Sequence, residues 1–427
     1  MGIKEETAKM KLAAPKLAAA PMEKRNQALK NIEKALEENK EAIFEANKKD
    51  MDGAKESGVS ENIMKRLKYN EAKLKDSISG IESLISLPDP LNKVTLKRQL
   101  SEGLTLCRVT CPIGVIGVIF EARPDALVQI SSLCIKSGNC AVLKGGKETA
   151  NTNKVLFELI YKAAIDAGLP EEALLQAESH SDIDELLDCS GSVDLLIPRG
   201  SNAFVRHIMD NTKIPVMGHS DGICHIYVDE SADFDEAVKV IVDAKTQYTA
   251  ACNAVDTILV NRKIAPAFLP VMEKALKEAG VKIRGTKEAS EILPGIEVIE
   301  GEDFRHEYLS LALGVKLVEG VDEAIEHINY YGSHHTDSIL SKDDANIEKF
   351  MQLVDSAGVY ANCSTRFADG YRYGFGAEVG ISTGKIHARG PVGLEGLVTY
   401  KYRLYGEGHI VADFASGKKQ FDFKDLE

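Results

Sequence analysis

The sequence predicts an α/β fold with two parallel-sheet domains. From Gly114 onward, short apolar runs typical of strands alternate with longer stretches of helical periodicity. This alternation indicates a mostly parallel sheet with helices on both faces. A second region with the same alternation runs from about Ile226 to Cys363. A chain of 427 residues is also too long for one compact core, so two or three domains are expected.

The first and last segments of the chain have different patterns. Residues 3–87 are predicted to form successive helices rich in Lys, Glu and Ala. A β-hairpin is expected over residues 94–111, and a second one closes the chain, with strands at Leu397 to Tyr402 and His409 to Phe414. Hairpins leave unpaired strand edges, which proteins often pair across a subunit interface. We therefore expect a homo-oligomer.

The two α/β regions contain strands and helices in regular order. In the first region these are expected at Val115 to Phe120, Ala126 to Lys136, Cys140 to Leu143, Thr149 to Ala167, Val193 to Ile197 and Ala203 to Asp210. In the second they are expected at Asp235 to Tyr248, Thr257 to Val260, Ala265 to Ala279, Gly314 to Val318 and Val321 to Asn329.

Composition excludes several classes of function. The net charge of −13 argues against nucleic acid as the main partner, because phosphate contacts need a basic surface. The longest apolar run, Pro112 to Phe120, is about half of the ~18 residues that a membrane span needs. The N-terminus has no apolar signal core. We expect a cytoplasmic protein that binds neither nucleic acid nor membranes.

Cysteine and histidine spacing gives no sign of a metal centre. None of the eight cysteines forms a C-x-x-C pair. His334-His335 is the only histidine pair in the sequence, and no carboxylate pattern accompanies it. The cysteines are expected to be thiols in a reducing compartment, most of them packed in the core. No metal site is predicted.

One cysteine stands apart from regular structure. Cys252 lies in the segment Thr249-Ala250-Ala251-Cys252-Asn253-Ala254, where a predicted helix meets a predicted strand. Its small neighbours leave room for a substrate to reach the sulfur, so a thiol of lowered pKa there could be a nucleophile. The alternative is a buried core cysteine, which is the usual role of a free thiol.

Two predicted strand-to-helix turns are candidate phosphate sites. Leu143-Lys144-Gly145-Gly146-Lys147-Glu148 combines glycines, which let the backbone approach a ligand, with two lysines. Pro198-Arg199-Gly200-Ser201-Asn202 offers backbone N–H groups, a hydroxyl and a guanidinium. Glycines and lysines are common in such turns, so each signal is weak by itself. Two such turns before a candidate nucleophile make a stronger argument.

These segments resemble a known superfamily. Gly138 to Lys144 is similar to the "GNxxxxK" cofactor strand of the aldehyde dehydrogenases, Gly200-Ser201 to their Gly-Ser turn, and Cys252 to their nucleophile. Narrower motifs resemble the gamma-glutamyl phosphate reductase family within it. They are Gly117 to Asp125, Gly218 to His225, Tyr331 to Asp337, Ser364 to Gly370 and His387 to Pro391.

The resemblance implies a fold and a domain plan. The fold is aldehyde-dehydrogenase-like, with two Rossmann-like domains and a small β oligomerisation element. Residues 1–225 are expected to form the NADPH-binding domain, with the hairpin 94–111 as oligomerisation element. Residues 226–363 are expected to form the catalytic domain. Residues 364–427 are expected to return to the first domain and end in the second oligomerisation hairpin.

The resemblance also implies a reaction. L-Glutamyl 5-phosphate would be reduced by NADPH to L-glutamate 5-semialdehyde through a thioester on Cys252, the second step of proline biosynthesis. Association with a glutamate 5-kinase is also suggested. Runner-up interpretations are a CoA-acylating aldehyde dehydrogenase, which uses the same cysteine, and a cofactor-binding scaffold without catalysis.

Individual site roles follow from the same resemblance. Lys144 and Lys147 would hold the adenosine end of the cofactor, and a lysine at 147 favours the 2′-phosphate of NADPH. Gly200 and Ser201 would contact the pyrophosphate, and Glu307 the nicotinamide ribose. Arg123 and Arg366 are the candidate substrate arginines; a surface salt bridge is the alternative role for each.

Two departures from ordinary aldehyde dehydrogenases bear on the chemistry. Gly218 stands at the position of the glutamate that activates water, so hydrolysis of a thioester is disfavoured. Ala122 replaces the asparagine of the oxyanion hole, which leaves the Cys252 backbone N–H and Asn253 as the expected donors.

Overall fold

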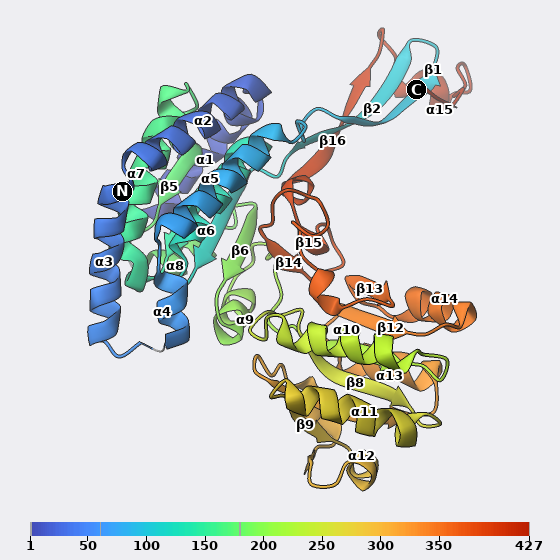
Figure 1. The fold of residues 1–427 in the computed structure, drawn as a ribbon. Coiled ribbons are helices and arrows are strands. Elements are labelled where there is room, and N and C mark those ends of the chain that lie inside the picture. Colours follow the sequence, from blue (N-terminus) through green and yellow to red (C-terminus); the bar gives the residue numbers. More distant parts are fainter. Residues whose placement is uncertain (1, 60, 179–180, 427) are drawn as a thin grey trace. The chain divides into compact units, whose positions relative to one another are not determined.

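The computed structural model describes residues 2–59, 61–178 and 181–426 and separates into two compact units (Figure 1). Unit 1 comprises Met1–Met217 and Val392–Glu427, and unit 2 comprises Gly218–Pro391. These boundaries differ from the expected ones at 225/226 and 363/364. Residues 364–391 stay with unit 2 because they hydrogen-bond to it, for example through the Ala368 and Ile381 carbonyl oxygens.

Unit 1 is built around a parallel sheet with the strand order β5-β4-β3-β6. Every residue of β3 is buried, as expected for a strand covered on both faces. The four strands are β3 (Val115–Phe120), β4 (Cys140–Gly145), β5 (Leu174–Gln176) and β6 (Leu195–Arg199).

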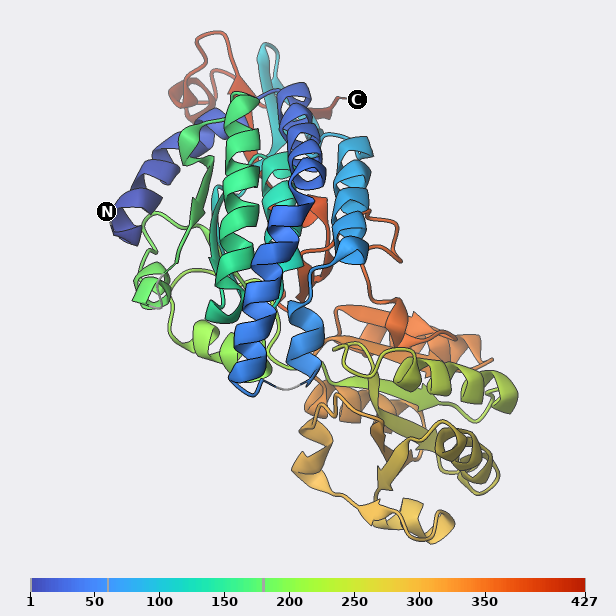
Figure 2. The same cartoon turned by 60° about the vertical axis from the view of Figure 1, so that its left-hand side comes forward.

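Helices cover this sheet and form the expected N-terminal run. In Figure 2 the N-terminal helices, in blue, lie beside the green helix α7, and α2 and α3 both pack against it. The helices of unit 1 are α1 (Ile3–Ala18), α2 (Met22–Glu38), α3 (Lys40–Glu56), α4 (Glu61–Leu67), α5 (Glu71–Ser86), α6 (Pro124–Ser137), α7 (Ala150–Asp166), α8 (Ser181–Leu187), α9 (Asn202–Asp210) and α15 (Val411–Ala415).

A second sheet of unit 1 has the order β16-β2-β1-β17 and extends away from the helices as a ribbon (Figure 1). The expected hairpin is present as β1 (Val94–Ser101) and β2 (Leu104–Pro112). The predicted C-terminal hairpin was wrong. Strand β16 (Val398–Tyr405) pairs with the open edge of β2, and α15 replaces the expected second strand. The short β17 (Lys424–Asp425) then pairs with β1.

Unit 2 contains a parallel sheet with the order β10-β9-β11-β8-β7-β12-β13. The strands are β7 (Cys224–Val228), β8 (Val255–Asn261), β9 (Lys282–Gly285), β10 (Glu297–Val298), β11 (Ala312–Val318), β12 (Thr336–Leu340) and β13 (Gly358–Ala361). The helices are α10 (Phe234–Thr246), α11 (Ala265–Glu278), α12 (Lys287–Ile292), α13 (Val321–Tyr331) and α14 (Asp344–Leu353). The short strands β14 (Gly380–Ser382) and β15 (Gly390–Val392) pair with each other.

Two apolar clusters form the core of unit 2. The larger one packs α10 and α11 against one face of the sheet, with Phe268 and Met272 fully buried. The smaller one packs α13 and α14 against the sheet, around Tyr227 and Phe350. None of the described helices is long and apolar enough to cross a membrane.

Candidate active site

The predicted cofactor residues of unit 1, and the candidate substrate residue Arg123, lie at the ends of three neighbouring strands. Arg123 comes after β3, Lys144 and Lys147 lie at the end of β4, and Gly200-Ser201 follows β6. Strand β3 pairs with both β4 and β6 in parallel register, so the three turns lie at the same carboxyl edge of the sheet. This edge is where parallel sheets place nucleotide ligands.

The Gly200-Ser201 turn already binds a carboxylate of the same chain, that of Glu121. The Ser201 backbone N–H, at the start of α9, donates to Glu121 Oε2 at 2.9 Å. A Cβ on Gly200 would lie 2.4 Å from that same oxygen and 2.7 Å from Phe204 Cδ1. The turn therefore offers a backbone donor to a negative charge, and glycine gives the space for a close approach.

The lysine turn after β4 has one buried and one exposed cation. Lys144 is buried, and its Nζ donates to the Gly145 carbonyl at 2.7 Å. Burial lowers its pKa, while the carboxylates of Asp182 and Glu148 oppose that shift. Lys147 is exposed in the short 3-10 helix Lys147–Thr149. An exposed ammonium and the Ser201 N–H are chemically suited to the phosphates of a nucleotide.

Ala122 has an unusual backbone conformation at the position of the missing asparagine. Its φ is 48°, which is uncommon for a residue other than glycine. Its N–H donates to Glu148 Oε1 at 2.6 Å, so β3 and the lysine turn are joined by this bond. Arg123 is half-buried directly after it.

Cys252 lies in the turn between α10 and β8 in unit 2, as the sequence predicted. Its side chain is half-buried. Gly222 packs directly against it: a Cβ on that glycine would lie 2.3 Å from the Cys252 carbonyl oxygen and 2.5 Å from Cys252 Cβ. Gly222 was not predicted as a site residue, since no local pattern shows that it touches a residue thirty positions away.

Asn253 joins the Cys252 turn to the segment 364–368. Its Nδ2 donates to the Ala368 carbonyl at 2.8 Å, and Thr365 Oγ1 donates to the Asn253 carbonyl at 2.7 Å. The Oδ1 atom of Asn253 is buried and has no partner among the described residues. These bonds bring Arg366 into the neighbourhood of the sulfur.

Arg366 shares a polar partner with a second arginine. Its Nε donates to Gln247 Oε1 at 3.0 Å, and Arg372 Nη2 reaches the same oxygen at 3.5 Å. Burial, then the positive charge of Arg372, lowers the pKa of Arg366, while Cys252 and two aspartates act in the opposite direction. Arg366 is therefore close to the candidate nucleophile, and the two guanidinium groups form a cationic cluster. Sequence reasoning singled out Arg366 but not Arg372.

Two histidines lie beside the sulfur. One ring nitrogen each of His219 and His335 and the Cys252 sulfur all lie within 4.8 Å of one another. The two rings meet edge to face, with centroids 4.8 Å apart. No metal site was predicted at His334-His335, because only the fold brings His335 close to His219 and Cys252.

Glu307 occupies a loop that a buried ion pair anchors. The neighbouring Tyr308 N–H donates to Asp256 Oδ1 at 3.1 Å, and Lys245 Nζ lies 3.2 Å from the same oxygen. Burial raises the pKa of Asp256 to about 6 despite the opposing Lys245 ammonium. The half-buried Glu307 is thus held in place from the start of β8, within unit 2.

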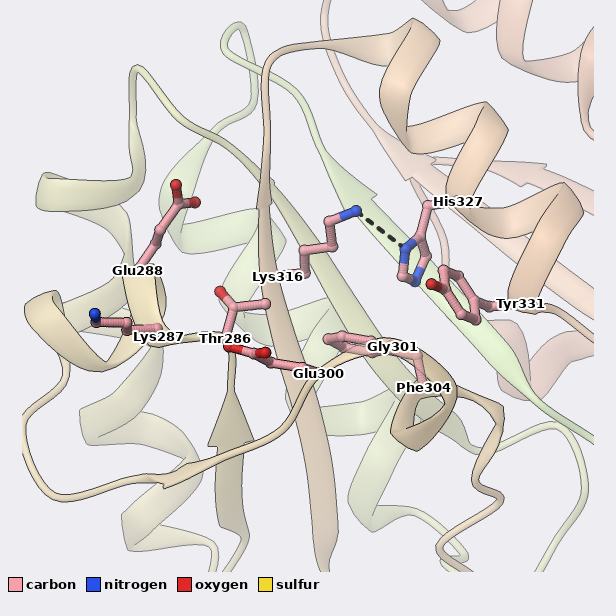
Figure 3. A pocket seen from close by; sticks show the side chains of 9 residues that line it. All are labelled: Thr286, Lys287, Glu288, Glu300, Gly301, Phe304, Lys316, His327 and Tyr331. Atoms are coloured by element: carbon pink, nitrogen blue, oxygen red, sulfur yellow. Dashed lines mark hydrogen bonds between the residues drawn. The ribbon is translucent and has the colours of Figure 1, made fainter.

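Unit 2 also contains a cavity of about 290 Å³ (Figure 3). His327 Nδ1 lies 3.4 Å from Lys316 Nζ in its wall. The cavity is lined by Thr286, Lys287, Glu288, Glu300, Gly301, Phe304, Lys316, His327 and Tyr331. None of the predicted site residues is among them.

Comparison with known proteins places the chain in a family. Residues 2–297 match the model of the aldehyde dehydrogenase family. The chain is 54% identical to a gamma-glutamyl phosphate reductase of Acetivibrio thermocellus over 421 residues, which cover 99% of this chain and 97% of that protein. The chain belongs to the gamma-glutamyl phosphate reductase family. Gamma-glutamyl phosphate reductase 1 of Synechocystis sp. is 52% identical over 97% of this chain and 96% of its own.

Solved structures support the same assignment. The gamma-glutamyl phosphate reductase of Thermotoga maritima superposes with a TM-score of 0.93 at 41% identity, covering 95% of this chain and 99% of that one. An acetylating aldehyde dehydrogenase of Geobacillus thermoglucosidasius, at 17% identity and a TM-score of 0.65, shares the fold over 95% of this chain and 97% of its own. The expected aldehyde-dehydrogenase-like fold is confirmed.

Proposed function

We propose that this protein reduces L-glutamyl 5-phosphate to L-glutamate 5-semialdehyde and phosphate with NADPH, the second step of proline biosynthesis. The observation that carries the proposal is the position of Cys252: half-buried, in a turn of small residues, and next to a cationic cluster. Relatives named for this activity match the chain over nearly its whole length. The reaction is expected to take place in the cytoplasm.

Cys252 acts as the nucleophile. Its thiolate attacks the γ-carbonyl carbon, a C–S bond forms, and phosphate leaves with the electron pair of the C–O bond, giving a thioester. Phosphate is a good leaving group, so no general base has to assist its departure. With Gly218 in place of the glutamate of hydrolytic relatives, the thioester is protected from water until it is reduced.

The developing oxyanion needs donors that Ala122 cannot supply from its side chain. The Cys252 backbone N–H and the Asn253 amide are the proposed donors. Asn253 uses one amide hydrogen to bind the Ala368 carbonyl, and the second hydrogen of the same NH₂ group is the one assigned to this role.

The substrate carries a phosphoryl group and an α-carboxylate, which call for guanidinium groups. Arg366 is the proposed ligand close to the sulfur, and Arg372 extends the same cationic cluster. Arg123, at the start of α6, is the second arginine proposed to bind the substrate.

The nicotinamide cofactor is assigned to the carboxyl edge of the unit 1 sheet. Lys144 and Lys147 are proposed to hold its adenosine end and 2′-phosphate, and Gly200 with Ser201 its pyrophosphate. The Ser201 N–H already binds a carboxylate, so this donor suits an anion. Glu307 is the proposed ligand of the nicotinamide ribose. The bound cofactor supplies the hydride that reduces the thioester.

A homo-oligomer completes the proposal. Strand β16 exposes Tyr400, Tyr402, Leu404 and Tyr405, an apolar surface on the edge of the β1-β2 ribbon. Long exposed strands of this kind favour pairing with another chain. Association with a glutamate 5-kinase, which would deliver the unstable acyl phosphate directly, belongs to the same proposal.

The reaction is best tested in reverse, because glutamyl phosphate cyclises readily. Purified enzyme receives glutamate 5-semialdehyde and NADP⁺, with and without inorganic phosphate, and NADPH formation is followed by absorbance. We expect phosphate-dependent NADPH formation that Cys252→Ala abolishes. Cys363→Ala, at another half-buried cysteine of unit 2, is the matched control and should retain activity.

The same assay separates the competing functions. NADPH formation that needs CoA and ignores phosphate would identify a CoA-acylating enzyme. Turnover without either acceptor would identify a hydrolytic dehydrogenase and contradict the role given to Gly218. A well-folded protein that binds NADP⁺ but never turns over would support the scaffold.

A further inference from the structure

Three side chains that are far apart in the sequence meet at one edge of the unit 2 sheet. His219 precedes β7, Cys252 precedes β8, and His335 directly precedes β12. Strand β7 lies between β8 and β12 in parallel register, so the amino ends of these strands are neighbours. The sulfur and one nitrogen of each ring are mutually within 4.8 Å.

A hydrogen bond indicates which nitrogen of His219 carries the proton. Its Nδ1 lies 2.8 Å from the Ile381 carbonyl oxygen. A carbonyl only accepts hydrogen bonds, so Nδ1 carries the proton, and in the neutral ring the lone pair is at Nε2. A ligating histidine whose other ring N–H donates to a backbone carbonyl is a common arrangement around metal ions.

His335 supplies an independent sign of a ligand. Its side chain is completely buried, and Nδ1 contacts Thr336 Oγ1 at 3.0 Å and Cys224 Sγ at 3.6 Å. Its Nε2 is buried with no hydrogen-bond partner among the described residues. Buried polar atoms without a partner are uncommon in folded proteins and call for an explanation.

We infer that His219, Cys252 and His335 form a binding site for Zn²⁺ centred on the nucleophile. Two imidazole nitrogens and one thiolate are the borderline-soft donors that Zn²⁺ prefers. Around a tetrahedral Zn²⁺ such donor atoms are roughly 3.3 to 3.6 Å apart, so the three atoms, which lie within 4.8 Å of one another, have to approach by at most about 1.5 Å. Three protein ligands leave the fourth position to water.

Binding at this site blocks catalysis reversibly. The Cys252 thiol releases a proton as its sulfur becomes a Zn²⁺ ligand, and the bound sulfur can no longer attack a carbonyl carbon. Arg366, which interacts electrostatically with Cys252, opposes the approach of a cation and limits the affinity. The site is therefore suited to inhibition that a chelator relieves.

Co²⁺ substitution tests the site without any enzyme turnover. Metal-free protein is titrated with Co²⁺, and the near-ultraviolet charge-transfer band from thiolate sulfur to cobalt is recorded. We expect the wild type to give this band, Cys252→Ser to lack it, and His335→Gln to bind Co²⁺ at least tenfold more weakly. Bound Co²⁺ should be displaced by Zn²⁺.

His327→Gln is the matched control, because His327 is another buried histidine of unit 2 with an unpartnered Nε2. It should bind Co²⁺ as the wild type does, and circular dichroism should show that all variants are folded. If His335→Gln fails to fold, His219→Gln at the half-buried ring takes its place. A wild type without the band, or a band that survives Cys252→Ser, would overturn the inference.

Alkylation gives a second readout that is independent of the proposed reaction. Zn²⁺ should protect Cys252 from iodoacetamide in peptide mass spectra, and a chelator should restore labelling. Cys363 should be labelled equally with and without Zn²⁺. Loss of protection at Cys252 would contradict the site even if the reductase assay succeeds, and protection would support it even if that assay fails.

Discussion

The two units use opposite edges of similar parallel sheets. In unit 1 the predicted site residues lie at the ends of β3, β4 and β6, at the carboxyl edge of the sheet. In unit 2 Cys252, His219 and His335 precede β8, β7 and β12 and lie at the amino edge. The general rule for open α/β sheets places ligands at the carboxyl edge, so it predicts a ligand site in unit 1 and does not predict the cluster of Cys252, His219 and His335 in unit 2.

The two candidate sites obtain their positive charge in different ways. At the carboxyl edge, helices begin, and N–H groups such as that of Ser201 are available to anions. At the amino edge, helices end: α10 ends at Thr246, before Cys252. A thiolate there gains nothing from a helix N-terminus, so side chains such as Arg366 must provide the positive charge.

The largest expected effect comes from crowding the nucleophile. Gly222→Ala places a methyl group against the Cys252 backbone, which cannot yield as a side chain can, and activity should fall about 100-fold. Gly200→Ala in unit 1 meets only the side chains of Glu121 and Phe204, which can move more easily than backbone, and should cost less. Gly320→Ala, with no atom within 4 Å, is the control. Equal losses of activity in Gly222→Ala and Gly200→Ala would show that the two sheet edges tolerate crowding equally.

Buried carboxylates offer a stability test of the same contrast. Asp337 in unit 2 accepts from both the backbone N–H and Nδ1 of His225 at 2.8 Å and is fully buried. Asp337→Asn should lower the free energy of unfolding by about 2 to 3 kcal/mol. Asp50 in unit 1 accepts from the backbone N–H groups of Asn151 and Thr152 at the start of α7.

Asp50 also accepts from Asn151 Nδ2 at 2.8 Å and from Thr152 Oγ1, so Asp50→Asn turns one of two doubly bonded acceptor oxygens into a donor and should likewise cost about 2 to 3 kcal/mol. Urea denaturation of both variants, monitored by circular dichroism, gives the comparison. A larger loss for Asp50→Asn would show that unit 1 depends more on its buried polar groups than unit 2 does.

Lys147→Glu tests the charge assigned to the carboxyl edge. Replacing the exposed ammonium with a carboxylate should repel a 2′-phosphate, and the ratio of kcat/KM for NADPH over NADH should fall at least tenfold. Lys154→Glu makes the same charge change at another exposed lysine, on α7, and should leave the ratio unchanged. If the NADPH/NADH ratio fell equally in both variants, the cause would be the overall electrostatic potential of the protein and not a contact of Lys147 with the 2′-phosphate.

The smallest effect concerns pH. Burial, then the neighbouring His225 and Lys316, lowers the pKa of His327 to about 2, so the folded ring stays neutral while the unfolded one gains a proton below about 6.5. Stability is therefore complete above that pH and falls as pH decreases. Relative to His327→Gln, the wild type should lose about 1.4 kcal/mol between pH 7.5 and 5.5. If wild type and His327→Gln differ in free energy of unfolding by the same amount at both pH values, the lowered pKa of His327 is contradicted.

Sequence reasoning worked where the signal was local. Alternating strands and helices gave the fold class, and the break between α10 and β8 gave the position of Cys252. It failed where contacts join distant segments: Gly222, Arg372 and the meeting of His219 with His335 depend on strand order. The C-terminal misprediction has another cause. The segment from His409 to Phe414 alternates apolar and polar residues like a strand, but Val411–Ala415 forms α15.

The pairing of β16 with β2 has a consequence for synthesis of the chain. All of unit 2 lies between these strands in sequence, so the edge of β2 waits until the last part of the chain leaves the ribosome. At typical elongation rates that wait is on the order of tens of seconds. Unit 2, a continuous segment, can fold during this time. Until β16 is available, the unpaired edge of β2 can pair with a strand of another nascent chain. We therefore expect the yield of folded protein to fall when synthesis of the C-terminal segment is delayed.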